Sequence, residues 1–265
     1  MKYCSKCKAS AANHWSYCTK CGCYIGNDIG ETDTEYECDK CKVSFFGGTF
    51  CPSCGTNVLD ARNFLFGENA VDHKNLKVGM QVSIGSYFFH FRNNKIPLEW
   101  IILAKETGKV LLISKYAVDG RRYNGPTGCT WENSEIRDWL HTKFLDAAFT
   151  EEEKESIILT TQKCYGSPDC EDKIFLLSEA EFDSYISSTP LVKEVKHLAC
   201  CYPTEYAELG GAKKGGRGTC QWWLRKNCKN EYDAVFVNRN NFREMHVQPN
   251  IKMGIRPVIW VQTDE

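Results

Sequence analysis

The chain has 265 residues, 42% of them hydrophobic, and a formal net charge of −1. It can therefore bury a substantial core and has room for more than one domain, while its charge gives no general attraction to nucleic acid or anionic membranes. No apolar run approaches the roughly 20 residues of a membrane span, and the N-terminus lacks the apolar core of a signal peptide. We therefore expect a cytoplasmic protein with no membrane partner.

The cysteines are concentrated near the N-terminus. Nine of the sixteen lie in the first 54 residues, and eight of those nine form CxxC pairs. Without a signal peptide, this pattern favours metal thiolates over disulfides. Two CxxC turns supply the four sulfurs of a tetrahedral zinc site. The predicted ligands are Cys4, Cys7, Cys18 and Cys21 for one ion, and Cys38, Cys41, Cys51 and Cys54 for a second.

Each cysteine quartet resembles a zinc ribbon, and the pair is similar to the tandem double zinc ribbon of many bacterial proteins. We place the first ribbon at residues 1–26, the second at 35–58 and a linker at 59–75. All four positions of each site are filled by protein, so we expect two structural Zn²⁺ ions with no open position for a substrate. Cys23 is left over and is an alternative to Cys21 as a ligand.

The charge of the ribbon region argues against a nucleic-acid partner. Residues 1–60 contain six lysines and seven acidic residues, and eight thiolates with two Zn²⁺ ions add a charge of about −4. Phosphate binding requires clustered positive charge. A nucleic-acid adaptor that acts through the ribbons therefore remains only an alternative.

The body, residues 76–263, begins with strand-like segments at Met80–Ile84, Glu99–Ala104 and Val110–Ser114. Gly108 separates the last two segments and predicts a hairpin. The segment Trp131–Phe149 then predicts an amphipathic helix with Ser134 as its N-cap. Its apolar residues recur at steps of three and four: Ile136, Trp139, Leu140, Phe144, Leu145 and Ala148.

Two capping boxes mark the next helices. Thr150–Glu153 predicts a short helix to about Ile158, and Ser178–Glu181 predicts another that runs to Ile186. A strand is expected between them at Ile174–Leu177. From Leu191 to Thr219 no periodicity holds, and the segment from Gly210 to Gly218 is expected to be a mobile surface loop. Further strands are predicted at Gln221–Leu224, Ala234–Val237 and Ile255–Val261.

The order of these segments resembles the DUF6273 family. Six motifs carry the resemblance: VGMQVSIGSY (78–87), LEWIILAKETGKVLLISKYAVD (98–119), TWENSEIRDWL (130–140), KIFLLSEAEFDSY (173–185), CQWWLRKN (220–227) and GIRPVIWV (254–261). Lys226 departs from the family, which usually has Ser after Leu-Arg. The resemblance implies one α+β domain.

The closing layout is also similar to the C-type-lectin-like fold of formylglycine-generating enzymes and of variable proteins of diversity-generating retroelements. It consists of a Trp-rich strand with an Arg, a polar stretch, Gly-x-Arg-Pro and a terminal strand. This resemblance implies that the late loops form a ligand surface.

The stretch Asn238–Gln248 is the best candidate for that surface, because its side chains offer many hydrogen-bond donors and acceptors. An ordinary polar loop is the alternative. Trp222 and Trp223 should point to opposite faces of a strand, so that one can be a surface platform. Arg225 and Arg256 are expected to be internal anchors rather than ligand contacts. The candidate ligand-binding residues are Trp222, Arg225, Asn238, Arg239, Asn240, Asn241, Arg243 and His246.

No catalytic motif is present, and we predict no catalytic residues. Cys220 and Cys228 suggest an alternative, a thiol-dependent enzyme on a formylglycine-generating-enzyme-like scaffold, although their surroundings do not match that motif. The Cys164/Cys170 and Cys200/Cys201 pairs are expected to be buried free thiols. The favoured interpretation is a non-enzymatic binding module, with a protein or small molecule as partner.

Overall fold

The structure is a computed structural model, and it divides the chain into two units, Met1–Asp60 and Ala61–Glu265. In the first unit it describes the backbone of four short strands. In the second it describes residues 76–89, 95–164, 168–190, 195, 198–215, 217–226, 234–238 and 243–263, with the backbone alone for residues 243–246. The eight predicted zinc ligands lie outside the described residues.

The four strands of the first unit form two antiparallel hairpins. Strand β1 (Lys2–Tyr3) pairs with β2 (Ser10–Ala11), and β3 (Glu35–Glu37) pairs with β4 (Ser44–Phe46). The segments between the paired strands are residues 4–9 and 38–43, so each encloses the first CxxC of one quartet. The same hairpin therefore occurs at the same place in both predicted ribbons.

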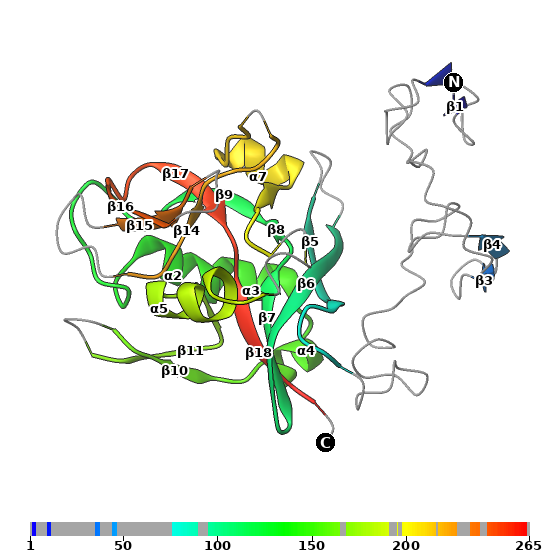
Figure 1. Cartoon of the computed structure of the whole chain (residues 1–265), viewed down its shortest axis with the longest axis horizontal. Helices are drawn as coiled ribbons and strands as arrows, with labels where there is room; N and C mark the ends of the chain where they lie inside the picture. The colour runs from blue at the N-terminus through cyan, green and yellow to red at the C-terminus, as the bar shows by residue number, and fades with distance from the viewer. Residues whose placement is uncertain are drawn as a thin grey trace. The chain divides into compact units, whose positions relative to one another are not determined.

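The body contains a first antiparallel sheet of order β12-β18-β7-β6-β5 (Figure 1). Its strands are β5 (Gln81–Phe88), β6 (Lys95–Glu106), β7 (Lys109–Ser114), β12 (Ile174–Phe175) and β18 (Val258–Gln262). The turn between β6 and β7 contains Gly108 at a φ of 71°, which confirms the predicted hairpin. Strand β6 is longer than predicted, but its central residues 100–103 are all buried.

A second sheet has the order β16-β15-β14-β17-β9. Its strands are β9 (Asp119–Arg122), β14 (Trp222–Trp223), β15 (Ala234–Val237), β16 (Arg243–Val247) and β17 (Lys252–Ile255). The single strand predicted at Ile255–Val261 is therefore wrong, because β17 ends at Ile255 and β18 begins in the other sheet at Val258. Pro257 has no N–H to donate to a ladder, and the chain changes sheets there.

The predicted amphipathic helix is present at residues 135–148. It consists of α2 (Glu135–Trp139), a π-helical turn (Leu140–Phe144) and α3 (Leu145–Ala148). Ser134 caps it as predicted, and its Oγ accepts a hydrogen bond from Arg137 N at 3.3 Å. Five of the six residues of the predicted apolar face are buried, and Leu145 packs against the core.

Both capping boxes are confirmed. Helix α4 (Glu151–Ser156) begins after Thr150. Helix α5 (Glu179–Phe182) begins after Ser178 and continues as a π-helical turn (Asp183–Ser187).

The segment from Leu191 to Thr219 is more ordered than predicted. It contains helix α7 (Glu205–Gly210), which Thr204 caps, and strand β13 (Tyr202–Pro203), which pairs with β8 (Tyr116–Ala117). The glycine-rich segment is therefore not simply a surface loop, because its first residue ends α7. The hairpin of β10 (Thr160–Gln162) and β11 (Cys170–Asp172) was also not predicted.

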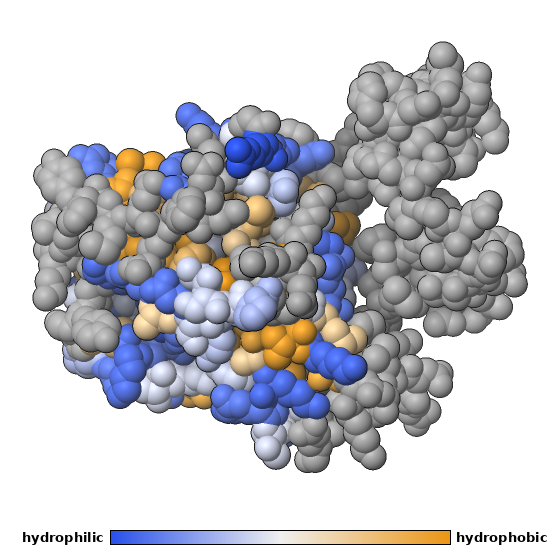
Figure 2. All heavy atoms as spheres, in the orientation of Figure 1, coloured by the Kyte–Doolittle hydropathy of each residue, from blue (hydrophilic) through white to orange (hydrophobic). Residues whose placement is uncertain are grey.

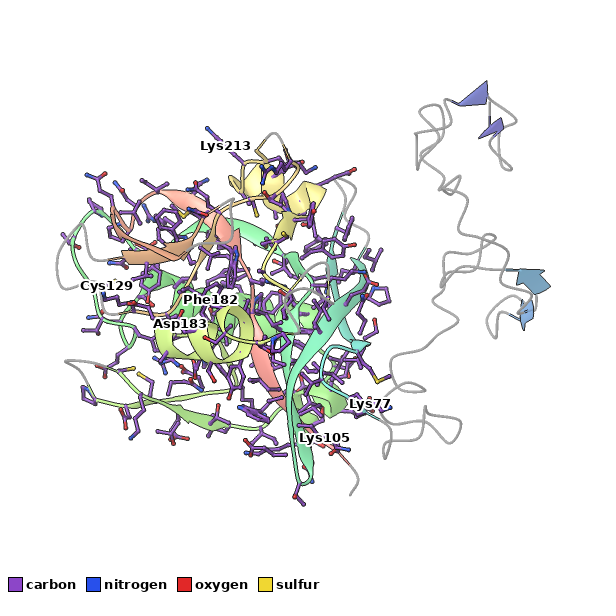
Figure 3. The ribbon with its side chains drawn as sticks, in the orientation of Figure 1. Lys77, Lys105, Cys129, Phe182, Asp183 and Lys213 are labelled. Atoms are coloured by element: carbon purple, nitrogen blue, oxygen red, sulfur yellow. The ribbon has the colours of Figure 1, made fainter. Side chains whose placement is uncertain are left out.

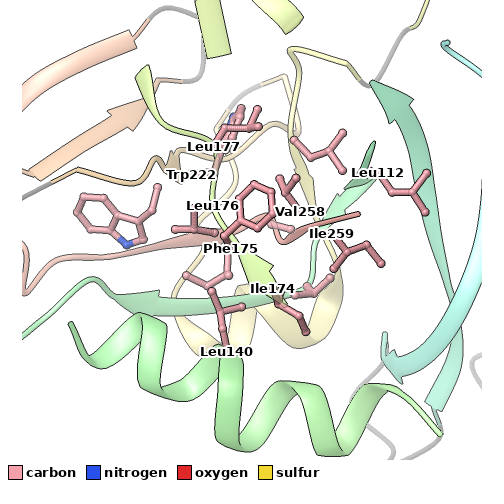
Figure 4. Packing of buried hydrophobic residues seen from close by; sticks show 14 of the residues in the cluster. Leu112, Leu140, Ile174, Phe175, Leu176, Leu177, Trp222, Val258 and Ile259 are labelled. Atoms are coloured by element: carbon pink, nitrogen blue, oxygen red, sulfur yellow. The ribbon is translucent and has the colours of Figure 1, made fainter. Parts of the chain in front are cut away.

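The core of the body is continuous between the helix and the two sheets. Figure 4 shows Leu140 of the helix, Phe175 of β12, Trp222 of β14 and Val258 of β18 in one cluster. On the visible face of the body, hydrophilic and hydrophobic residues are interspersed (Figure 2). Within the described part of the chain, no helix is long and apolar enough to cross a membrane. These elements make the body an α+β domain.

Candidate functional site

The predicted recognition segment belongs to a hairpin at the edge of the second sheet. Strand β16 pairs with β15 alone in the sheet order, with Val237 opposite Arg243 and a register shift between Ala234 and Phe236. The prediction of an irregular loop over the whole of 238–248 is therefore wrong, because 243–247 is a strand. Asn238 and Gln248, at the two ends, are half-buried.

Most of the predicted ligand contacts in this segment have side chains that lie outside the described part of the structure. Residues 239–242, including Arg239, Asn240 and Asn241, lie outside the described residues. The backbones of Arg243 and His246 lie in β16, but their side chains are not described. The hairpin nevertheless has a firm base, since all four residues of β15 are buried.

Trp222 and Trp223 both belong to this base, with 1% and 0% of their surface exposed. Trp222 packs against Phe182, with ring centroids 5.8 Å apart, and Trp223 Nε1 donates a hydrogen bond to Arg121 O at 2.9 Å. Phe182 is the last residue of α5 and is labelled in Figure 3. The prediction that one of the two forms a surface platform is wrong, because this strand is covered on both faces. Trp222 is a core residue rather than a ligand contact.

Arg225 is an internal anchor. It is 5% exposed, and its Nε donates to Leu176 O at 3.1 Å. Its Nη1 donates to Lys163 O at 2.7 Å, and its Nη2 to Glu181 Oε2 at 2.9 Å. The guanidinium is thus committed to the protein itself, so its place among the ligand contacts was wrong.

A second buried arginine lies next to a pair of thiols. Arg256 is 0% exposed. Its Nε donates to Ser114 O at 2.7 Å and its Nη1 to Leu198 O at 2.6 Å, and the guanidinium carbon lies 5.1 Å from the centroid of the Trp222 ring. Cys201 and Cys220 are each 1% exposed, and their sulfurs are 3.9 Å apart.

The electrostatics of the thiol pair are asymmetric. Burial raises the pKa of Cys201, but the hydrogen bond from Cys220 and the charge of Arg256 outweigh it and leave this pKa lowered. The pKa of Cys220 is raised by the hydrogen bond to Cys201 and by burial. Burial lowers the pKa of Arg256, which the neighbouring thiols counteract. Of the two thiols, Cys201 is therefore the one that loses its proton more readily.

The family comparison assigns this body. The family model described as "Domain of unknown function (DUF6273)" matches residues 107–263, more than half of the chain. The chain belongs to the DUF6273 family. No curated protein and no solved structure matches it. The DUF6273 match begins in the turn between β6 and β7, yet β5 and β6 complete the same sheet.

A polar cluster around Asp172 also lies within the DUF6273 match. Asp172 is 0% exposed, and it accepts hydrogen bonds from Trp131 Nε1 at 2.6 Å and from Arg137 Nε at 2.8 Å. His141 Nε2 lies 3.2 Å from Oδ1. Sequence reasoning missed this cluster, because Arg137 and His141 lie outside the apolar face of the predicted helix and β11 was not predicted.

The other described cysteines of the DUF6273 body are Cys129, Cys164, Cys170 and Cys200. Among the described residues, no group of three or more His, Cys, Asp or Glu side chains is placed to hold a metal ion. Cys164 and Cys170 are free, with sulfurs 3.7 Å apart. Cys164 and Cys200 are only half-buried, so the prediction of a buried thiol is wrong for these two residues. Cys228 lies outside the described residues, and Cys220 has Cys201 as its neighbour instead.

Proposed function

We propose that this DUF6273 chain is a cytoplasmic, non-enzymatic binding module that recognises a protein or a small ligand through residues 238–248. The observation that carries the proposal is the position of this segment. It includes the outer strand, β16, of a hairpin whose inner strand, β15, is entirely buried. Polar side chains on a rigid base are typical of recognition surfaces, because the scaffold fixes the ligand contacts at little entropic cost.

The anchoring of the preceding strand supports the same proposal. Arg225 follows β14 and is tied to three different segments of the body, while Trp222 and Trp223 fill the core beneath the sheet. The candidate contacts are therefore reduced to Asn238, Arg239, Asn240, Asn241, Arg243 and His246.

A C-type-lectin-like arrangement of the body is part of the proposal. Strands β14 to β17 form one sheet with β9, and the chain then crosses at Arg256–Pro257 into the other sheet. This order supports the proposal, because the polar stretch follows β15 and precedes β17, although it includes strand β16.

Two structural zinc ions complete the proposal. The donor sets fit zinc, since each contains four cysteines in two CxxC pairs. The two short hairpins support it further, because each carries its first CxxC in the segment between paired strands. Zinc bound there would cross-link the strands of a unit too small to build a core, and such binding contributes roughly 10–16 kcal/mol of apparent folding free energy.

The test compares two triple variants of the full chain. In the first, Arg239, Asn241 and Arg243 are replaced by alanine. In the matched control, the exposed residues Lys143, Glu155 and Arg217 are replaced instead. Each protein is immobilised, and the molecules retained from a cell extract are identified by mass spectrometry. The proposal expects molecules that the control retains and the first variant loses while its thermal unfolding is unchanged. Equal retention by both folded variants would overturn it.

A further inference from the structure

The Cys201/Cys220 pair has the geometry of a dithiol that can close. Cys220 N donates a hydrogen bond to Cys201 O at 2.8 Å, so the two main chains are held side by side. The sulfurs are 3.9 Å apart, and a disulfide requires about 2.05 Å. Side-chain rotations are the movement that would close this gap, because the two residues are already joined by a main-chain hydrogen bond.

The charge of Arg256 favours deprotonation of Cys201 within this pair. A guanidinium that is 0% exposed is costly unless an opposite charge or hydrogen bonds compensate it. Its donors at Ser114 O and Leu198 O provide part of this compensation. The thiols that act on its charge are Cys201, Cys220 and Cys200, and a thiolate on Cys201 supplies the negative charge. The thiolate is the nucleophilic form of cysteine.

We propose that Cys201 and Cys220 form a peroxide-reactive dithiol, in which Cys201 attacks hydrogen peroxide and Cys220 completes a disulfide. The Cys201 thiolate attacks one peroxide oxygen, the O–O bond breaks, and a sulfenic acid forms with release of hydroxide, which takes up a proton to become water. Cys220 then loses its proton and attacks the Cys201 sulfur. The S–O bond breaks, and the departing hydroxide takes the Cys220 proton as a second water. Both thiols are oxidised, and one peroxide is reduced to two waters.

The burial of the two thiols limits the size of the oxidant that can react with them. Cys201 and Cys220 are each 1% exposed, whereas Cys200, directly before Cys201, is only half-buried. Gly254 approaches closely, since a Cβ there would lie 3.0 Å from the Cys220 sulfur. Hydrogen peroxide is little larger than water, so it is the oxidant whose access to such a site requires the least opening of the structure. An alkyl hydroperoxide or a bulky thiol reagent is expected to react far more slowly with the folded protein.

The Cys164/Cys170 pair is an internal comparison. Its sulfurs are 3.7 Å apart, slightly closer than those of Cys201 and Cys220. Burial, followed by the hydrogen bond and charge of Cys164, raises the pKa of Cys170 to about 11. If sulfur separation alone decided reactivity, this pair and the Cys201/Cys220 pair would oxidise alike. The proposal instead predicts that the pair beside Arg256 reacts first.

The experiment treats the full-length, zinc-loaded chain with hydrogen peroxide. At intervals the remaining thiols are alkylated in denaturant, and disulfide-linked peptides are quantified by mass spectrometry. The Cys201–Cys220 link is expected to form at least about tenfold faster than the Cys164–Cys170 link. An equal or slower rate for Cys201–Cys220, or full alkylation of both residues after peroxide treatment, would overturn the proposal.

Three variants separate the roles of the residues. In Cys220→Ser, Cys201 should stop at the sulfenic acid and be labelled by dimedone once the peroxide is removed and the protein is denatured, whereas in Cys201→Ser no dimedone label should appear on Cys220 under the same conditions. The Cys164→Ser/Cys170→Ser variant should form the Cys201–Cys220 link at the unchanged rate. tert-Butyl hydroperoxide should be at least about tenfold slower than hydrogen peroxide with the folded chain and comparable in denaturant. Dimedone labelling of Cys220 in Cys201→Ser, with none of Cys201 in Cys220→Ser, would contradict the assigned roles.

Discussion

Arg225 and Ser178 share one carboxylate oxygen. Glu181 Oε2 accepts a hydrogen bond from Arg225 Nη2 at 2.9 Å and another from Ser178 N at 2.6 Å. The capping box that begins α5 is therefore also the anchor of the segment that leaves β14. The Glu181 side chain thus takes part both in a local helix cap and in a long-range hydrogen bond with Arg225. It lies under the sheet that carries the candidate recognition hairpin.

Replacing Arg225 by Met should destabilise the body by about 2–4 kcal/mol, because it removes charged hydrogen bonds and leaves the carbonyls of Leu176 and Lys163 without this donor. Urea unfolding followed by tryptophan fluorescence measures the change. Lys226→Met is the matched control, since Lys226 Nζ pairs with Glu179 at 3.2 Å near the surface, and its loss should cost below about 1 kcal/mol. Equal effects of the two substitutions would contradict the anchoring role.

Asp172→Asn should destabilise the body by about 3–5 kcal/mol. Asp172 is fully buried, and the substitution leaves Arg137 without its carboxylate. Chemical unfolding at neutral pH measures this change. Asp146→Asn is the control, because Asp146 pairs with Lys154 at the surface, and its effect should be below about 1 kcal/mol.

The same carboxylate should contribute to acid sensitivity. Burial alone would raise the pKa of Asp172, but the hydrogen bonds from His141, Trp131 and Arg137 outweigh burial and leave the pKa below its ordinary value of 3.8. The native state therefore binds this proton less readily than the unfolded chain. The stabilisation is present above the unfolded pKa and disappears as the pH falls through the native pKa. The stability gap between the wild type and Asp172→Asn should accordingly shrink from about pH 5 to about pH 2; a constant gap would contradict the shift.

Gly120→Ala should destabilise the contact between β9 and α7. A Cβ at Gly120 would lie 2.4 Å from both Ala207 O and Ala212 N, and relieving such an overlap costs about 1–3 kcal/mol or more. Gly108→Ala is the control that distinguishes steric overlap from backbone strain. Nothing lies within 4 Å of a Cβ at Gly108, so only its φ of +71° makes alanine unfavourable there. That control should cost about 1–2 kcal/mol. Thermal unfolding compares the stability of the two variants. A smaller loss of stability for Gly120→Ala than for Gly108→Ala would show that α7 can shift away from β9 at little cost.

The purified chain should contain two zinc ions. Cys38→Ser should lower the zinc content of the chain to one ion, and the leftover Cys23→Ser should leave it at two, because the first quartet retains Cys21. Elemental analysis by mass spectrometry gives the count directly. A wild-type chain that contains well under two zinc ions would contradict the prediction of two zinc sites.

The features that sequence predicted best depend on neighbours in the chain. Ser134, Thr150 and Ser178 cap helices through residues three positions away, and Gly108 forms a turn through its own backbone. A single sequence displays such patterns directly.

The features that sequence missed depend on distant partners. One of Trp222 and Trp223 was expected to be exposed, because the two point to opposite faces of a strand. Alternation along the strand does not reveal that α5 covers one face of this sheet. The approach of the Cys201 and Cys220 sulfurs, and the charge interaction of both thiols with Arg256, join segments that no local pattern relates. The split of the last predicted strand at Pro257 likewise reflects which sheet each half joins.

The central claim is that residues 238–248 touch the ligand, and site-specific photo-crosslinking tests it most directly. A benzophenone amino acid is introduced at Asn238, which is half-buried at the end of β15, and separately at Leu159, which is 53% exposed before β10. After irradiation in a cell extract, mass spectrometry compares the adducts of the two proteins. The account predicts a specific adduct at position 238 and none of that identity at position 159. The same adducts at both positions, or a specific adduct at position 159 alone, would contradict it.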